Sequence, residues 1–150
     1  MSSVEEAFGF SPTNSVTIVL DGDPIAKGRP RFSRKSGATY TPVKTQRYED
    51  RLAWAAQVVM RGLPLLDMAL VVRIVVYKSV PDSWSIKKRA AALAGTTRPT
   101  GKPDVDNYAK CMDALNKIVW TDDSLIVELN VKKFYSDRPR LEIFVEALDG

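Results

Sequence analysis

The sequence predicts an α+β fold, in which a small mixed sheet with an antiparallel C-terminal hairpin packs against about three helices. Short runs of β-branched and aliphatic residues alternate along the chain with longer segments whose apolar residues recur at helical spacing. The last two short runs are separated only by a turn, which favours an antiparallel pair. The length of 150 residues and the hydrophobic fraction of 45 % fit one globular domain.

The N-terminal part of the chain opens with a polar segment, residues 1–14, which we expect to be a flexible leader before a single domain over residues 15–150. The β-branched run at residues 16–20 predicts the first strand. Residues 21–30 contain two glycines and two prolines and therefore predict a loop. Residues 31–40 predict an irregular hairpin.

The spacing of apolar residues, helical or alternating, also predicts the remaining elements. Thr41 is expected to cap a long helix that has Pro42 at its first helical position. Later segments predict, in order, a strand, two helices and two strands, at residues 69–77, 83–94, 107–117, 125–134 and 141–147.

The composition excludes several kinds of chemistry. The chain has no histidine and a single cysteine, so serine–histidine and cysteine–histidine catalysis and structural zinc are ruled out. The net charge of +4 and the pI of about 9.2 weakly favour a polyanionic partner. No signal peptide is recognisable, and the apolar runs are too short to span a bilayer, so we expect a cytoplasmic protein without a membrane partner.

Clustered carboxylates point to a metal site. If residues 104–106 are extended, Asp104 and Asp106 point the same way with Cα atoms ~6.5–7 Å apart. Asp106 can also cap the helix that begins at Asn107. On a helical wheel, four charged residues share one sector, namely Asp106, Lys110, Asp113 and Lys117. Asp122 and Asp123 follow at the start of the next predicted strand, which can bring a third acid to the first two.

Oxygen ligands alone suit Mg²⁺ or Mn²⁺, which can polarise a phosphate and activate water, while a nearby lysine stabilises the transition state. A purely structural interpretation of the same residues stays open. In that interpretation Asp106 is only a helix cap, Lys110 is its ion-pair partner, and the Asp122–Asp123 pair is a turn.

The second sequence feature that points to a function is a basic segment. Between residues 24 and 47 the chain has no acidic residue and seven cations, namely Lys27, Arg29, Arg31, Arg34, Lys35, Lys44 and Arg47. Such a loop can bind a phosphate backbone, although a solvated loop without a partner has the same composition. The shorter run of cations at residues 87–89 fits the exposed face of a helix. Trp54, Trp84 and Trp120 are expected to be core or groove-lining residues.

Two segments resemble a known family. Residues 102–129 read K-P-D-V-D-N-Y-A-K-C-M-D-A-L-N-K-I-V-W-T-D-D-S-L-I-V-E-L, and residues 22–31 read G-D-P-I-A-K-G-R-P-R. Both resemble signatures of the RusA family of Holliday-junction resolvases. The chain departs from the family near Pro99, where many relatives have a histidine before the K-P-D, and at Tyr108, where leucine is usual.

The resemblance implies a homodimer that cleaves four-way DNA junctions by paired symmetric nicks with Mg²⁺ or Mn²⁺, in recombination and repair. It places the essential residues at Asp104, Asp106, Asp123 and Lys110, with Asp122 as the alternative third ligand. Asn107 and Asp113 are expected to support these residues, and DNA contacts are expected at Lys27, Arg29, Arg31, Arg34 and Lys35. Two other functions stay open, a metal-dependent nuclease acting on other branched DNA or structured RNA, and a non-catalytic nucleic-acid-binding module.

Overall fold

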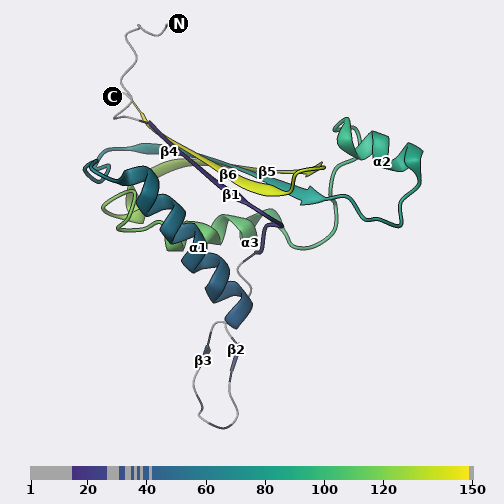
Figure 1. Ribbon diagram of the computed structural model, residues 1–150. Helices are drawn as coiled ribbons and strands as arrows, with labels where there is room; N and C mark the ends of the chain where they lie inside the picture. The colour runs from purple at the N-terminus through teal and green to yellow at the C-terminus, as the bar shows by residue number, and fades with distance from the viewer. Residues whose placement is uncertain are drawn as a thin grey trace, which may run out of the picture.

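The computed structural model describes residues 15–26, 31–32, 35, 37, 39–40 and 42–148 (Figure 1). The described strands are β1 (Ser15–Asp21), β2 (Arg31–Phe32), β3 (Thr39–Tyr40), β4 (Leu70–Ser79), β5 (Ile126–Ser136) and β6 (Arg140–Ala147). The helices are α1 (Val43–Met60), α2 (Ile86–Leu93) and α3 (Val105–Ala109), with short 3₁₀ segments η2 (Lys110–Ala114) and η3 (Asp123–Leu125). The leader predicted at residues 1–14 lies outside the described residues.

Four strands form one sheet in the order β1-β6-β4-β5. β6 pairs antiparallel with both β1 and β4, whereas β5 pairs parallel with β4. The predicted α+β class with a mixed sheet is confirmed. β5 and β6 run in opposite directions and are joined by a short turn, as expected of the C-terminal pair, but β4 lies between them in the sheet. β2 and β3 form the separate hairpin that the sequence predicted.

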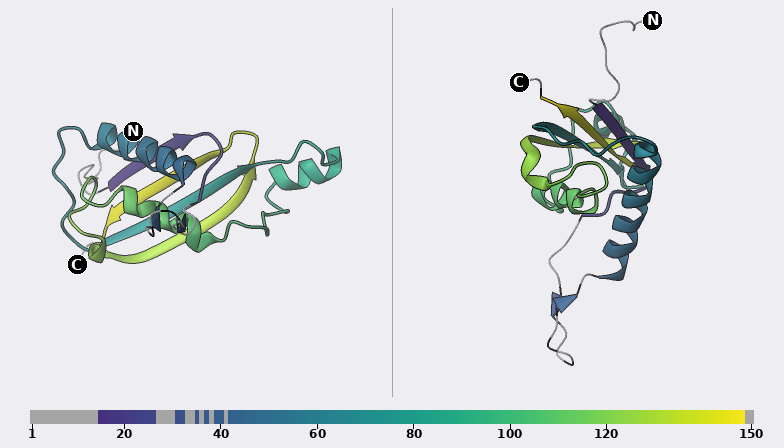
Figure 2. Two further views of the ribbon diagram at one scale, coloured as in Figure 1. Left: turned by 90° about the horizontal axis from the view of Figure 1, so that it is seen from below. Right: turned by 90° about the vertical axis from the view of Figure 1, so that its left-hand side faces the viewer.

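One face of the sheet carries the core. Alternate side chains of β1, β4 and β6 are buried there, and α1 and α3 pack against this face (Figure 2). Tyr48, Leu52 and Ala56 supply the buried stripe of α1 at helical spacing. No helix of the described chain covers the opposite face, where Arg73 is exposed. Within the described chain the sheet therefore presents one open face, and β5 is the longer of its two edge strands.

Two predicted helix boundaries need correction. α1 begins at Val43 with Pro42 in the cap position, one residue later than predicted, and Thr41 lies outside the described residues. α2 is shorter than predicted, because the Ser85 side chain accepts a hydrogen bond from the Lys88 backbone N–H and caps a helix that begins at Ile86. Figure 1 shows α2 beyond the ends of β4 and β5, away from the core.

The predicted helix over residues 107–117 is also corrected. Helical geometry begins earlier, with Asp104 at the N-cap position of α3 and Asp106 inside the first turn. The helix tightens to 3₁₀ geometry at Lys110, and Lys117 adopts a positive φ of 67° outside it.

Candidate functional site

Asp104 and Asp106 lie at the start of α3 with uncommitted carboxylates. Asp104 has extended backbone angles (φ −71°, ψ 157°), and its side chain makes no capping hydrogen bond. Both side chains are exposed, and neither has a hydrogen-bond or ion-pair partner among the described residues. Two carboxylates that stand two residues apart without partners are free to bind a cation.

Lys110 lies one helical turn after Asp106, on the exposed side of the helix. Its Nζ donates a hydrogen bond to Asn107 Oδ1 at 3.3 Å. Tyr108 and Cys111, on the opposite side, are buried in the core. The predicted division of this helix into a charged face and a core face is therefore confirmed for its first turns. Burial raises the pKa of the Cys111 thiol to about 12, with a further contribution from the charge of Asp113, so this cysteine is a core residue.

Two lysines fix the segment that leads into Asp104. Lys133 Nζ, near the end of β5, donates to Gly101 O at 2.9 Å and to Pro103 O at 3.0 Å. Lys78 Nζ, near the end of β4, donates to Lys102 O at 3.3 Å. These bonds hold the start of α3 against the C-terminal ends of the two parallel strands.

The described start of the predicted basic loop lies at the same end of the sheet. Burial and the charge of Lys133 lower the pKa of Lys78, and the charge of Asp23 opposes this lowering. Burial raises the pKa of Tyr108, and the charge of Asp23 raises it further. Asp23 thus acts on both residues. Ile25 and Ala26 pack against the core. The predicted DNA contacts Lys27, Arg29 and Arg34 and the Arg31 side chain lie outside the described residues, and Lys35 is exposed.

Asp123 lies at the other end of β5. The buried Trp120 donates its indole Nε1–H to Asp123 Oδ1 at 2.7 Å, which fixes the carboxylate. Asp123 lines a hollow of about 310 Å³ at the start of β5, together with Met112, Asp113, Ile126, Val127, Glu128 and Leu129. The sequence analysis singled out Asp113 as a supporting residue, but the hydrogen bond from Trp120 to Asp123 had no signal beyond the W-T-D-D spacing.

Asp122 is used differently. Its Oδ2 accepts a hydrogen bond from the Ser124 backbone N–H at 3.0 Å, and its Oδ1 lies 3.9 Å from Lys117 Nζ. Hydrogen bonds from Ser124 are the main cause of a lowered pKa at Asp122. Its carboxylate therefore caps η3, while the second oxygen of Asp123 has no partner among the described residues.

The two carboxylate groups lie far apart within one chain. Asp104 and Asp113 are separated by nine residues of helical backbone, which span ~13–18 Å at a rise of 1.5–2.0 Å per residue. Asp123 shares its hollow with Asp113, at the far end of that span. Within the described part of the chain, no group of three histidine, cysteine, aspartate or glutamate residues is arranged to hold a metal ion.

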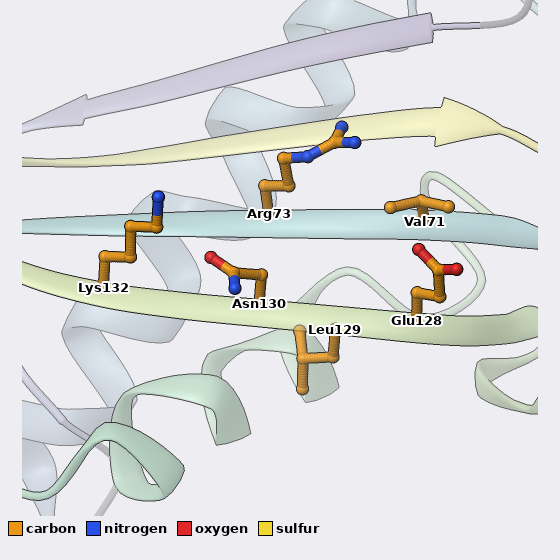
Figure 3. Close-up of a pocket in the computed structure, with 6 residues that line it drawn as sticks. All are labelled: Val71, Arg73, Glu128, Leu129, Asn130 and Lys132. Carbon is orange, nitrogen blue, oxygen red and sulfur yellow. The ribbon is translucent and has the colours of Figure 1, made fainter.

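A polar groove of about 500 Å³ lies on the uncovered face of the sheet, between β4 and β5. Figure 3 shows Arg73 rising from β4 and Glu128, Asn130 and Lys132 rising from β5. This groove was not predicted, although the alternation of polar residues along residues 126–132 indicates that one face of β5 is solvated. It lies on the opposite side of the sheet from α3, and it shares the lining residues Glu128 and Leu129 with the hollow beside Asp123.

Comparison with known proteins identifies the family. The family model described as Endodeoxyribonuclease RusA matches residues 21–146, which is most of the chain. The chain therefore belongs to the RusA endodeoxyribonuclease family. It is also 40 % identical over 145 residues to YqaN of Bacillus subtilis (strain 168), an uncharacterized protein, covering 90 % of this chain and 98 % of that relative. Among the described residues, no helix has the length and apolar character needed to cross a membrane.

Proposed function

We propose that this protein is a cytoplasmic, Mg²⁺- or Mn²⁺-dependent homodimer that resolves four-way DNA junctions by paired symmetric cleavage, in recombination and repair. One observation carries the proposal. In a chain of an endodeoxyribonuclease family, Asp104 and Asp106 stand together without partners among the described residues, and Lys110 lies one turn beyond Asp106.

The third carboxylate comes from a second copy of the chain in this proposal. Asp123 stands at the start of β5, and Asp104 lies against its far end, so a single chain holds them apart. An antiparallel pairing of two β5 strands reverses this order. With a two-fold axis near Leu129, residue 126 faces residue 132 of the partner subunit, and each Asp123 approaches the other chain's Asp104 and Asp106.

The free edge of β5 supports such a pairing. β5 is an edge strand of 11 residues, and Val127 and Leu129 are 55 % and 44 % exposed on the helix side of the sheet. An exposed, long and partly apolar edge strand is a template for pairing with another strand. A two-fold dimer also places two equivalent sites on a four-way junction, which is nearly two-fold symmetric.

The chemistry follows from the side chains. Asp104 and Asp106, with Asp123 of the partner subunit, form an oxygen-only ligand set that fits Mg²⁺ or Mn²⁺. When bound, such an ion supplies Lewis-acid stabilisation of the scissile phosphate and activation of water. Lys110 stabilises the negative charge that develops on the phosphate, and Asn107 holds the lysine in place. Trp120 orients the Asp123 carboxylate, and Asp113 adds negative charge beside it.

A synthetic four-way junction tests the proposal. With Mg²⁺ the protein should introduce paired symmetric nicks, EDTA should abolish them, and Asp106→Asn should lower the rate ~100-fold or more by removing one ligand charge. Binding of the Asp106→Asn protein should be unchanged or tighter, because a carboxylate that repels phosphate is gone. Asp50→Asn, an exposed carboxylate on α1, is the matched control and should keep full activity.

The same assay separates the alternatives. Faster cleavage of a flap, a duplex or a hairpin RNA than of the junction would favour a nuclease with another substrate. Tight junction binding without cleavage in any divalent ion would favour a non-catalytic binding module. Full cleavage by Asp106→Asn would contradict the assignment of the site.

A further inference from the structure

The segment between β4 and α3, residues 80–103, forms a basic extension of the fold. It contains α2, and it lies beyond the ends of β4 and β5 rather than over the sheet (Figures 1 and 2). Its only acidic residue is Asp82, whereas it carries five cations, namely Lys87, Lys88, Arg89, Arg98 and Lys102. We call this segment the α2 extension.

The cations of the α2 extension are positioned but not neutralised. Lys88 Nζ lies 4.0 Å from the ring centre of Trp84, and the Arg98 guanidinium lies 3.9 Å from that of Phe134. Arg98 Nε also donates to Lys133 O at 2.9 Å. None of the five cations forms a salt bridge with a described carboxylate. Lys88 and Arg98 are therefore held in place, and no described carboxylate neutralises any of the five charges, which stay available to an external anion.

The arrangement of charge on α2 does not serve the stability of the helix. Lys87 and Lys88 lie in the first turn, which contains no acidic residue. The positive end of the helix dipole is there, so cations at these positions are unfavourable by a few tenths of a kcal/mol each. The contact with the Trp84 ring offsets this cost at Lys88, whereas Lys87 has no compensating contact among the described residues, as is typical of a residue on a binding surface.

The α2 extension is continuous with the carboxylate site. It ends at Pro103, directly before Asp104, and Lys78 and Lys133 donate to the backbone of its last residues. Both lysines donate to backbone carbonyls within residues 101–103, so these two cations lie close together. A strip of positive charge therefore leads from α2 to Asp104.

We propose that the α2 extension is a second DNA-binding surface, which binds phosphates of the duplex arm next to the cleaved phosphate. This inference rests on the proposed function, because it takes the substrate to be branched DNA. Charge complementarity identifies the partner, since unpaired cations beside a phosphodiesterase site match the backbone of the same nucleic acid. Trp84 contacts Lys88 and packs edge-on against Tyr135, so its ring is engaged by the protein instead of presenting a stacking platform for unpaired bases.

The test compares two double variants for binding to a labelled four-way junction in EDTA, over a series of NaCl concentrations. Lys87→Gln with Lys88→Gln should weaken binding ~10-fold at low salt and reduce the slope of log Kd against log salt by about 2, one for each lost phosphate contact. Arg61→Gln with Arg73→Gln removes two exposed cations from outside the α2 extension and should leave the slope unchanged. Thermal unfolding of both proteins checks that they are folded.

Each outcome separates this inference from the proposed function. If the slope of log Kd against log salt is the same for the Lys87/Lys88 variant and the unaltered protein, the proposed DNA-binding surface is refuted, whether or not the junction is cleaved. An equal effect of both double variants would overturn it as well, because net charge alone would explain the result. The same loss of slope with a single-stranded oligonucleotide would overturn the assignment to a duplex arm. If the Lys87/Lys88 variant has a reduced salt slope but the unaltered protein never cleaves DNA, the result supports the DNA-binding surface and refutes the proposed nuclease function.

Discussion

At the scale of single residues, Asp122 and Asp123 differ in what holds their carboxylates. Ser124 and Lys117 engage Asp122, so it is committed to capping η3. Asp123 accepts one short hydrogen bond from the buried Trp120, lines a hollow, and has no other partner among the described residues. This difference supports Asp123 as the third metal ligand. Adjacent aspartates cannot be distinguished by sequence spacing, because the choice depends on a tryptophan buried by the rest of the fold.

Trp120→Phe tests the role of the indole. Phenylalanine keeps the aromatic ring in the core but cannot donate to Asp123, so the carboxylate loses its orientation. The Mg²⁺ concentration for half-maximal junction cleavage should rise ~10-fold or more, as is usual when the support of a metal ligand is removed. Trp54→Phe, on the exposed surface of α1, should leave that concentration unchanged. An unaltered Mg²⁺ response of a folded Trp120→Phe protein would refute the positioning role.

Among the secondary-structure elements, β5 is distinguished by its two different edges. Its inner edge pairs with β4 in parallel, and its outer edge is free within the described chain. The sequence predicted the strand and its alternation correctly, and it predicted an apolar face. It did not predict that Val127 and Leu129 on that face would be largely exposed, because η2 and α3 do not cover the outer half of the strand.

Val127→Asp tests whether this edge forms the dimer. A charge two residues from the centre of the proposed pairing, repeated by the two-fold axis, should dissociate the dimer and abolish junction cleavage together. Sedimentation equilibrium and the cleavage assay give the two readouts. Val58→Asp, at an exposed apolar position on α1, should remain dimeric and active. A dimeric and active Val127→Asp protein would place the interface elsewhere.

At the scale of the whole molecule, local pattern predicted most elements but not their neighbours. Alternation shows which side chains share a face, yet it does not show which strand lies beside which, so the position of β4 between β5 and β6 was not predictable. The arrangement of the candidate site was not predictable for the same reason. Asp104 and Asp123 are close in sequence, but α3, η2 and β5 carry them to opposite ends of the sheet.

In the proposed dimer two chains build each site, and mixed dimers of two inactive variants test this arrangement. Asp106→Asn and Asp123→Asn proteins should each be inactive alone. A mixed dimer of the two should contain one fully intact site, made of Asp104 and Asp106 from one chain and Asp123 from the other, and should nick one strand of the junction. If each chain built its own site, every site in the mixed dimer would lack a ligand. Restored nicking on mixing and refolding the two variants is therefore the predicted result, and continued inactivity of confirmed mixed dimers would contradict the account.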